Sequence, residues 1–144
     1  MSEIKIITDK RYLSRECDRS TLEEGTLIAS LLIKSLIERS DGIGLAANQI
    51  GIQKQVCVVN VTKPVILINP VIVKAEGSVS FLEGCLSFPG EEVLTERYSS
   101  IEVIADNHKD TLRFSKDDNL LECICIQHEI DHLNGITMYD RRKQ

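Results

Sequence analysis

Residues 119–134 read NLLECICIQHEIDHLN and decide the expected fold, because they predict one long helix near the end of the chain. Asp118 or Asn119 can cap the start of this helix, and Gly135 is typical of a residue that follows a helix end. The apolar side of such a helix must be covered by other elements. The strands that the sequence predicts upstream can supply this cover.

The same helix carries an H-E-x-x-H pattern made by His128, Glu129 and His132. Residues four apart lie on one helix face, so both imidazoles can reach one metal ion. Glu129 is rotated from His128 by about 100° and can lean over a metal-bound water without being a ligand. The alternative is a pair of surface histidines that match the pattern by chance.

An apolar stripe at one-turn spacings leads along the helix to His128, and it consists of Leu121, Ile124 and Cys125. This stripe places the histidines on or beside the buried face. A buried imidazole pair without a partner would be costly, and a metal ion is the simplest partner.

A third ligand must come from upstream, or the site has only two, because just 12 residues follow His132. Met138 stands where the metzincin pattern has its third histidine. His108 lies in a predicted turn, where an exposed histidine is unremarkable. Cys85, within the glycine-containing stretch FLEGCLSFPG, is the better candidate, although a small core residue is the alternative for it. A Cys–His–His set leaves a fourth position open for water.

Length, charge and cysteine usage exclude several classes of protein. A chain of 144 residues is expected to form a single domain, 1–144. Its net charge of −5 argues against direct nucleic-acid binding. No apolar run approaches the roughly 20 residues of a membrane span, and the N-terminus shows no secretory signal. Five cysteines without a disulfide framework predict reduced thiols and a cytoplasmic location.

The remaining elements are expected to be one further helix and several strands. Residues 20–39 predict a helix that Asp41 and Gly42 end, with five side chains facing the core: Leu27, Ile28, Leu31, Leu32 and Leu36. Strand character occurs at 56–61, at 65–75 with a bend at Asn69-Pro70, and at 101–106 and 111–115, which predict a hairpin. This order predicts an α+β fold with an antiparallel or mixed sheet packed around the C-terminal helix.

A stretch of small residues, GIGLAANQ at 42–49, stands between the first helix and the strands. It lacks the Lys-Ser/Thr ending of a phosphate loop. One interpretation is a tight turn packed against another segment. The other is a smooth surface that lets a substrate backbone approach, with Gln49 offering an amide to a developing oxyanion.

Three stretches, GIGLAANQ at 42–49, EGCLS at 83–87 and QHEIDH at 127–132, resemble in order and spacing the three signature motifs of the peptide deformylases. The resemblance covers roughly residues 20–140. It implies an α+β metal hydrolase that removes the formyl group from the N-terminal formyl-methionine of new polypeptides and releases formate. N-formylmethionyl nascent chains, met near the ribosome, are the partners that it implies.

The resemblance also implies residue roles. Its metal ligands fall on Cys85, His128 and His132, its general base and acid on Glu129, and its oxyanion donors on Gln49 and the backbone N–H of Leu86. One divalent ion is implied, with Fe²⁺ favoured and Zn²⁺, Ni²⁺ or Co²⁺ able to occupy the site. Contacts with the methionine and the peptide backbone fall on seven residues: Ile43, Gly44, Phe81, Gly84, Leu121, Ile124 and Cys125. We also expect Glu83 and Arg97 to pair and brace the Cys85 loop.

One departure from the family pattern is the ending MYDRRKQ, which lacks the long C-terminal helix of many bacterial members. How such a short form meets nascent chains is left open, and its source can be bacterial, viral or organellar. Two other functions stay open. A small H-E-x-x-H metallopeptidase would need the downstream ligand that is missing here, and a deformylase-like binding protein would have lost its activity.

Overall fold

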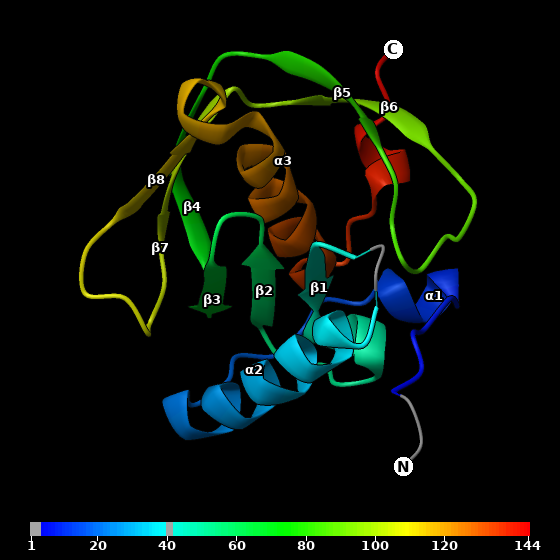
Figure 1. Cartoon of the computed structure of the whole chain (residues 1–144), viewed down its shortest axis with the longest axis vertical. Coiled ribbons are helices and arrows are strands. Elements are labelled where there is room, and N and C mark those ends of the chain that lie inside the picture. The colour runs from blue at the N-terminus through cyan, green and yellow to red at the C-terminus, as the bar shows by residue number, and fades with distance from the viewer. Residues whose placement is uncertain (1–3, 40–41) are drawn as a thin grey trace.

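Helix α3 (Lys116–Leu133) lies in the middle of the molecule, and strands lie around it (Figure 1). The structure is a computed structural model that describes residues 4–39 and 42–144. In this part of the chain the strands form three antiparallel sheets. The expected α+β fold is therefore confirmed, although the sheet is divided into separate pieces.

The first sheet contains β1 (Gly44–Ala46), β2 (Val56–Asn60) and β3 (Pro64–Ile68). The second contains β4 (Val71–Glu76), β7 (Ser100–Ile104) and β8 (Leu112–Ser115), of which β7 and β8 form the predicted hairpin. The third contains β5 (Val79–Glu83) and β6 (Val93–Arg97). The other elements are α1 (Lys10–Leu13), α2 (Leu22–Ile37) and the short 3₁₀ helices η1 (Ala47–Ile50) and η2 (Met138–Arg141).

The bend expected at Asn69-Pro70 separates β3 from β4 and sends them to different sheets. Asn69 has a φ of 53°, in the left-handed region that asparagine tolerates better than most residues. Its side-chain amide donates to the backbone oxygen of Ser20 at 2.8 Å and to the carboxylate of Asp106 at 2.7 Å. The bend is thus held by the start of α2 and the end of β7.

The start of α3 is built in two steps. Ser115 caps a first turn, and Asn119 then leaves helical geometry with φ −163° and ψ 103°. The Asn119 side chain accepts a hydrogen bond from the backbone N–H of Glu122 at 3.0 Å, so the regular helix begins there, as one of the two predicted caps requires. The helix ends at Asn134, and Gly135 follows with a φ of 75°.

Gly135 should be the glycine least tolerant of substitution at this end of the fold. A Cβ at this position would lie 2.5 Å from the backbone oxygen of Ser14, in addition to the strain of a positive φ. We expect Gly135→Ala to lower the free energy of unfolding by about 2–3 kcal/mol, measured by urea denaturation. Gly51→Ala is the matched control, because Gly51 has a φ of 88° but open space around its Cβ position. Equal losses for both variants would contradict the steric argument.

Helix α2 covers the first sheet with a narrower stripe than the sequence predicts. A capping box between Thr21 and Glu24 starts it, and it runs from Leu22 to Ile37, inside the expected bounds. Of the five expected core residues, three are buried: Ile28, Leu32 and Leu36. The prediction was wrong for Leu27 and Leu31, which are 67% and 42% exposed, because the helix packs against one sheet and its outer side faces solvent. Asp41, expected to help end the helix, lies outside the described residues.

The third sheet and β1 were not predicted. The first residues of the stretch FLEGCLSFPG, which contains Cys85, belong to β5, where Leu82 pairs with Leu94 of β6. In β6 the buried positions are Val93, Thr95 and Arg97. Two of these are polar or charged, so the apolar alternation that marks a half-buried strand is absent.

No helix in residues 4–39 or 42–144 is long and apolar enough to cross a membrane.

Candidate metal centre

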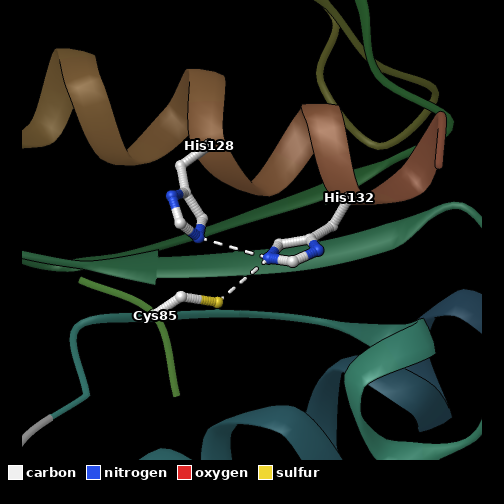
Figure 2. Close-up of side chains that lie close together, drawn as sticks. All are labelled: Cys85, His128 and His132. Atoms are coloured by element: carbon white, nitrogen blue, oxygen red, sulfur yellow. Dashed lines mark hydrogen bonds between the residues drawn. The ribbon is translucent and has the colours of Figure 1, made fainter. Parts of the chain in front are cut away.

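Three side chains with metal-binding atoms meet beside α3 (Figure 2). The Nε2 atoms of His128 and His132 are 3.2 Å apart, and the Cys85 sulfur lies 3.4 Å from the His132 Nε2. All three donor atoms lie within 4.8 Å of one another. Sulfur and nitrogen ligands arranged tetrahedrally around one ion would be separated by about 3.3–3.6 Å. Two of the three donor separations are close to these values, so the donor set could hold a single divalent ion.

The third donor is the cysteine that sequence analysis preferred. Cys85 stands two residues after the end of β5, and this strand brings it to the face of α3 that carries the two histidines. His108 lies in the turn between β7 and β8, where its Nε2 is 2.8 Å from the backbone oxygen of Ile66. Among the described residues, the group of side chains able to hold a metal is Cys85, His128 and His132.

A buried carboxylate fixes the orientation of the His128 ring. The His128 Nδ1 lies 2.8 Å from a Glu83 oxygen. Glu83 also accepts two hydrogen bonds from Arg97, at 2.7 and 2.8 Å, so the expected pair exists. Burial opposes the charged form of Glu83, but the bonds from Arg97 and His128 lower its pKa to about 2. An ionised Glu83 accepts a hydrogen bond from the Nδ1–H of His128, which leaves the Nε2 lone pair free for a metal.

The charges around the two imidazoles favour a cation. Burial disfavours a charged His128, yet the neighbouring Glu129, Cys85 and Glu83 raise its pKa well above the ordinary value. Burial lowers the pKa of His132, which therefore stays neutral. The groups that attract a proton to His128 would equally attract a divalent ion held between the rings.

Glu129 is positioned next to this donor set but keeps one oxygen uncommitted. The residue is only 4% exposed, and its Oε1 has no hydrogen-bond partner among the described residues. Burial is the main reason why the pKa of its carboxyl is raised to about 7. A buried carboxylate oxygen without a partner is costly, so Glu129 is a candidate for a chemical role.

Gln49, in the stretch 42–49, also lies beside the candidate metal centre. Its side-chain oxygen accepts from the backbone N–H of Ala46 at 2.9 Å. Its amide nitrogen donates to Ser87 at 3.1 Å and lies 3.6 Å from the Cys85 sulfur. The stretch is not simply a tight turn, since it contains strand β1 and helix η1, and η1 aims the amide at the Cys85 loop.

A cavity of about 1030 Å³ opens in front of these groups. Glu129, Gln49 and Leu86 line it. The structure also places in its wall all seven residues expected to contact substrate: Ile43, Gly44, Phe81, Gly84, Leu121, Ile124 and Cys125. The residues assigned to one site from three separate motifs are therefore gathered around one cavity.

Several residues that contact the donor residues or Glu83 and its partner Arg97 were not predicted from the sequence. The Asn48 side chain donates to the backbone oxygen of His132 at 2.8 Å and so connects the stretch 42–49 to α3. Thr95 donates to Glu83, and Asp131 accepts from Arg97. Asn48 and Asp131 stand inside the quoted motifs, and that position was their only sequence signal. Thr95 had none, because its strand was not predicted.

The fold and the donor set define a class of protein, an α+β protein with an H-E-x-x-H candidate metal centre on its central helix and a cysteine sulfur beside the two histidines. The family model of polypeptide deformylase matches residues 2–144. The chain belongs to the peptide deformylase family.

Individual relatives agree with this assignment. The peptide deformylase of Desulfitobacterium hafniense is 42% identical over 120 residues, which cover 81% of this chain and 79% of the relative. That of Aquifex aeolicus is 42% identical over 113 residues, 72% of this chain, and the match spans only 65% of its own length. The crystal structure of the Thermotoga maritima enzyme superposes with a TM-score of 0.86 at 29% identity, covering 100% of both chains. The Synechococcus elongatus structure, a complex with actinonin, gives 0.84 at 34% identity and covers 99% of this chain and 79% of that one.

Proposed function

We propose that this chain is a peptide deformylase, which hydrolyses the formamide bond at the N-terminal methionine of formylated peptides and releases formate. The observation that carries the proposal is the Cys85–His128–His132 donor set beside the uncommitted carboxylate oxygen of Glu129. Cys85, His128 and Glu129 line one cavity. Membership of the family supports it. The whole chain, 1–144, would act as one catalytic domain.

The proposed chemistry divides between the ion and the protein. When bound by Cys85, His128 and His132, a divalent ion supplies Lewis acidity that activates water and polarises a carbonyl. Glu129 accepts the proton of the attacking water and passes it to the leaving amine. The Gln49 amide and the backbone N–H of Leu86 donate to the oxygen that becomes negative in the transition state, and such a donor is typically worth about 3–4 kcal/mol.

The proposed substrate lies across the cavity in front of these groups. The methionine side chain would pack on Phe81, Leu121, Ile124 and Cys125, all of which line the cavity. Strand β1 is an edge strand, since it pairs only with β2 among the described strands. A peptide backbone can add beside Ile43 and Gly44 at that edge, and Gly84 would leave room for it on the opposite side.

The substrate assignment is tested by comparing three peptides: formyl-Met-Ala-Ser, acetyl-Met-Ala-Ser and unmodified Met-Ala-Ser. We expect formate from the first and no cleavage of the other two, with products identified by mass spectrometry. Cleavage of an internal peptide bond would instead support a small metallopeptidase. Tight binding of the formylated peptide without turnover would support a binding protein.

Gly44→Ala should lower activity by crowding Glu129 and not by weakening the fold. A Cβ at position 44 would lie 2.6 Å from the Oε2 of Glu129. The end of this side chain can move aside, so we expect little change in the melting temperature and in bound metal. Displacing a catalytic group by about 1 Å costs roughly 100-fold in rate, and we expect such a fall in kcat/KM. Unchanged activity would mean that Glu129 works from another position.

We propose Fe²⁺ as the physiological ion, with Zn²⁺, Ni²⁺ or Co²⁺ as possible occupants, since a thiolate and two imidazoles suit all four. A ferrous site beside Cys85 is open to oxidation. Protein prepared anaerobically should therefore contain iron and lose activity in air, whereas equal activity in both preparations would exclude the ferrous assignment.

The partners would be nascent chains that begin with formyl-methionine. Such chains emerge where translation starts with that residue, which places the protein in a bacterial cytoplasm or an equivalent compartment, near ribosomes. Sedimentation with translating ribosomes tests this proximity, and equal recovery of the protein with and without ribosomes would contradict it.

A further inference from the structure

The segment after α3 returns along β6 and forms part of the support of the metal centre. Arg142 pairs with Thr95 as an antiparallel bridge, and the backbone N–H of Lys143 donates to the oxygen of Leu94 at 2.9 Å. Between this bridge and α3, the helix η2 carries Arg141. The bridge therefore fixes the backbone that presents Arg141 to α3.

Arg141 donates two hydrogen bonds to the carboxylate of Asp131 in α3. Its Nε and Nη2 donate to the two oxygens of Asp131, each at 2.9 Å. The side chain of Asp131 is 9% exposed and that of Arg141 is 41% exposed. A single partly exposed ion pair contributes little to stability. The main effect of the two parallel hydrogen bonds is therefore to fix the position of the Asp131 carboxylate.

Asp131 also contacts Arg97, which in turn binds Glu83, the carboxylate next to His128. Arg97 donates from Nη1 to Asp131 at 2.5 Å, and its Nε and Nη2 are occupied by Glu83. Glu83 in turn lies against the Nδ1 of His128. Four charges in a row, two of each sign, thus connect the protein surface to a metal ligand.

Removing Arg141 would leave two buried carboxylates competing for one guanidinium. Arg97 could then move toward Asp131 and loosen its grip on Glu83, and the ring of His128 would lose its fixed orientation. We propose that Arg141 is a positioning residue for the metal centre, acting through Asp131, Arg97 and Glu83 on His128. This inference rests on the proposed metal site but not on the proposed substrate.

The rate of metal release from folded protein distinguishes a positioning role of Arg141 from a general effect on stability. The wild-type chain, Arg141→Ala and Arg141→Lys would be loaded with Co²⁺ and mixed with a chelator. The rate of transfer and the visible spectrum of bound Co²⁺ would be recorded at a temperature where circular dichroism finds every protein folded. We expect Arg141→Ala to release Co²⁺ about tenfold faster, at the low end of the effect of outer partners of metal ligands, and to shift the spectrum. Arg141→Lys should fall between it and the wild type.

Arg142→Ala is the matched control, because Arg142 is the exposed neighbouring cation and its side chain lies over the ring of Tyr139, away from Asp131. Equal release rates for the Arg141 and Arg142 variants would overturn the inference. So would a full effect of Arg141→Ala in an Asp131→Asn background, where the proposed connection is already weakened. If the alanine variant does not fold, the lysine variant decides on the same criterion. A wild-type chain that binds no Co²⁺ would overturn the proposed metal site itself, and this inference with it.

Discussion

Replacing Glu129 with glutamine should lower kcat for a formylated peptide by about 10³-fold, because removal of a general base typically costs 10²- to 10⁴-fold. The carboxylate has one buried oxygen without a partner, and glutamine keeps its shape while removing its ability to take a proton. The metal ligands are untouched, so bound metal should stay near the wild-type amount. Formate release and metal content, measured on the same sample, check both parts of this result.

Glu102→Gln is the control for the loss of one carboxylate, since Glu102 lies in β7 beside Lys74 and away from the cavity. It should leave kcat unchanged. Full activity of Glu129→Gln with metal bound would mean that the base is misassigned. Loss of metal from this variant would mean that Glu129 holds the site together instead of moving protons.

Arg97→Ala should lower the free energy of unfolding by about 3–5 kcal/mol, the cost of breaking a buried ion pair from one side. The substitution would leave the buried carboxylate of Glu83 without its two hydrogen bonds from Arg97, and Asp131 without one of its own. Urea denaturation measures the loss. Metal affinity should fall as well, because Glu83 would no longer hold the His128 ring in place.

Arg113→Ala provides the comparison for Arg97, since Arg113 is an exposed arginine of β8 and its loss should cost well under 1 kcal/mol. If Arg97→Ala were as mild, with metal affinity unchanged, the cluster would not support the metal centre. The inference about Arg141 would then fail too, because its effect passes through Arg97.

The parts of the fold that were predicted correctly depend on local signals. Asn119 caps α3 and Gly135 ends it through interactions within a few residues of each, and such interactions are visible in a short stretch of sequence. The three donor residues of the candidate metal centre could be selected for a similar reason. His128 and His132 have fixed spacing on a helix, and Cys85 stands in a distinctive glycine-containing stretch.

The parts that failed depend on what the chain packs against. Leu27 and Leu31 continue the apolar pattern of α2, but only the tertiary structure determines that one sheet covers one side of that helix. Strand β6 buries Thr95 and Arg97, and both donate to Glu83. The pair of Arg97 with Glu83 was expected, but the strand that presents these two polar side chains was not. Burial of a charge depends on a partner that is distant in sequence, so no local pattern announces it.

The candidate site follows the same division. Its donor atoms were predicted, while most of the groups that hold them were not. Asp131 and Asn48 lie inside motifs that were noted for other residues, and Arg141 lies in the ending MYDRRKQ, for which no role in the site was predicted. Each of the three side chains forms hydrogen bonds with a residue at least ten positions away in the sequence.

The most direct test of the account is formate release from formyl-Met-Ala-Ser by anaerobically purified protein whose metal content is measured on the same sample. We predict turnover that rises in proportion to bound metal up to about one ion per chain, disappears after chelation and returns when Fe²⁺ is restored. Formate release that persists in metal-free protein would contradict the account, as would a fully loaded protein that releases none.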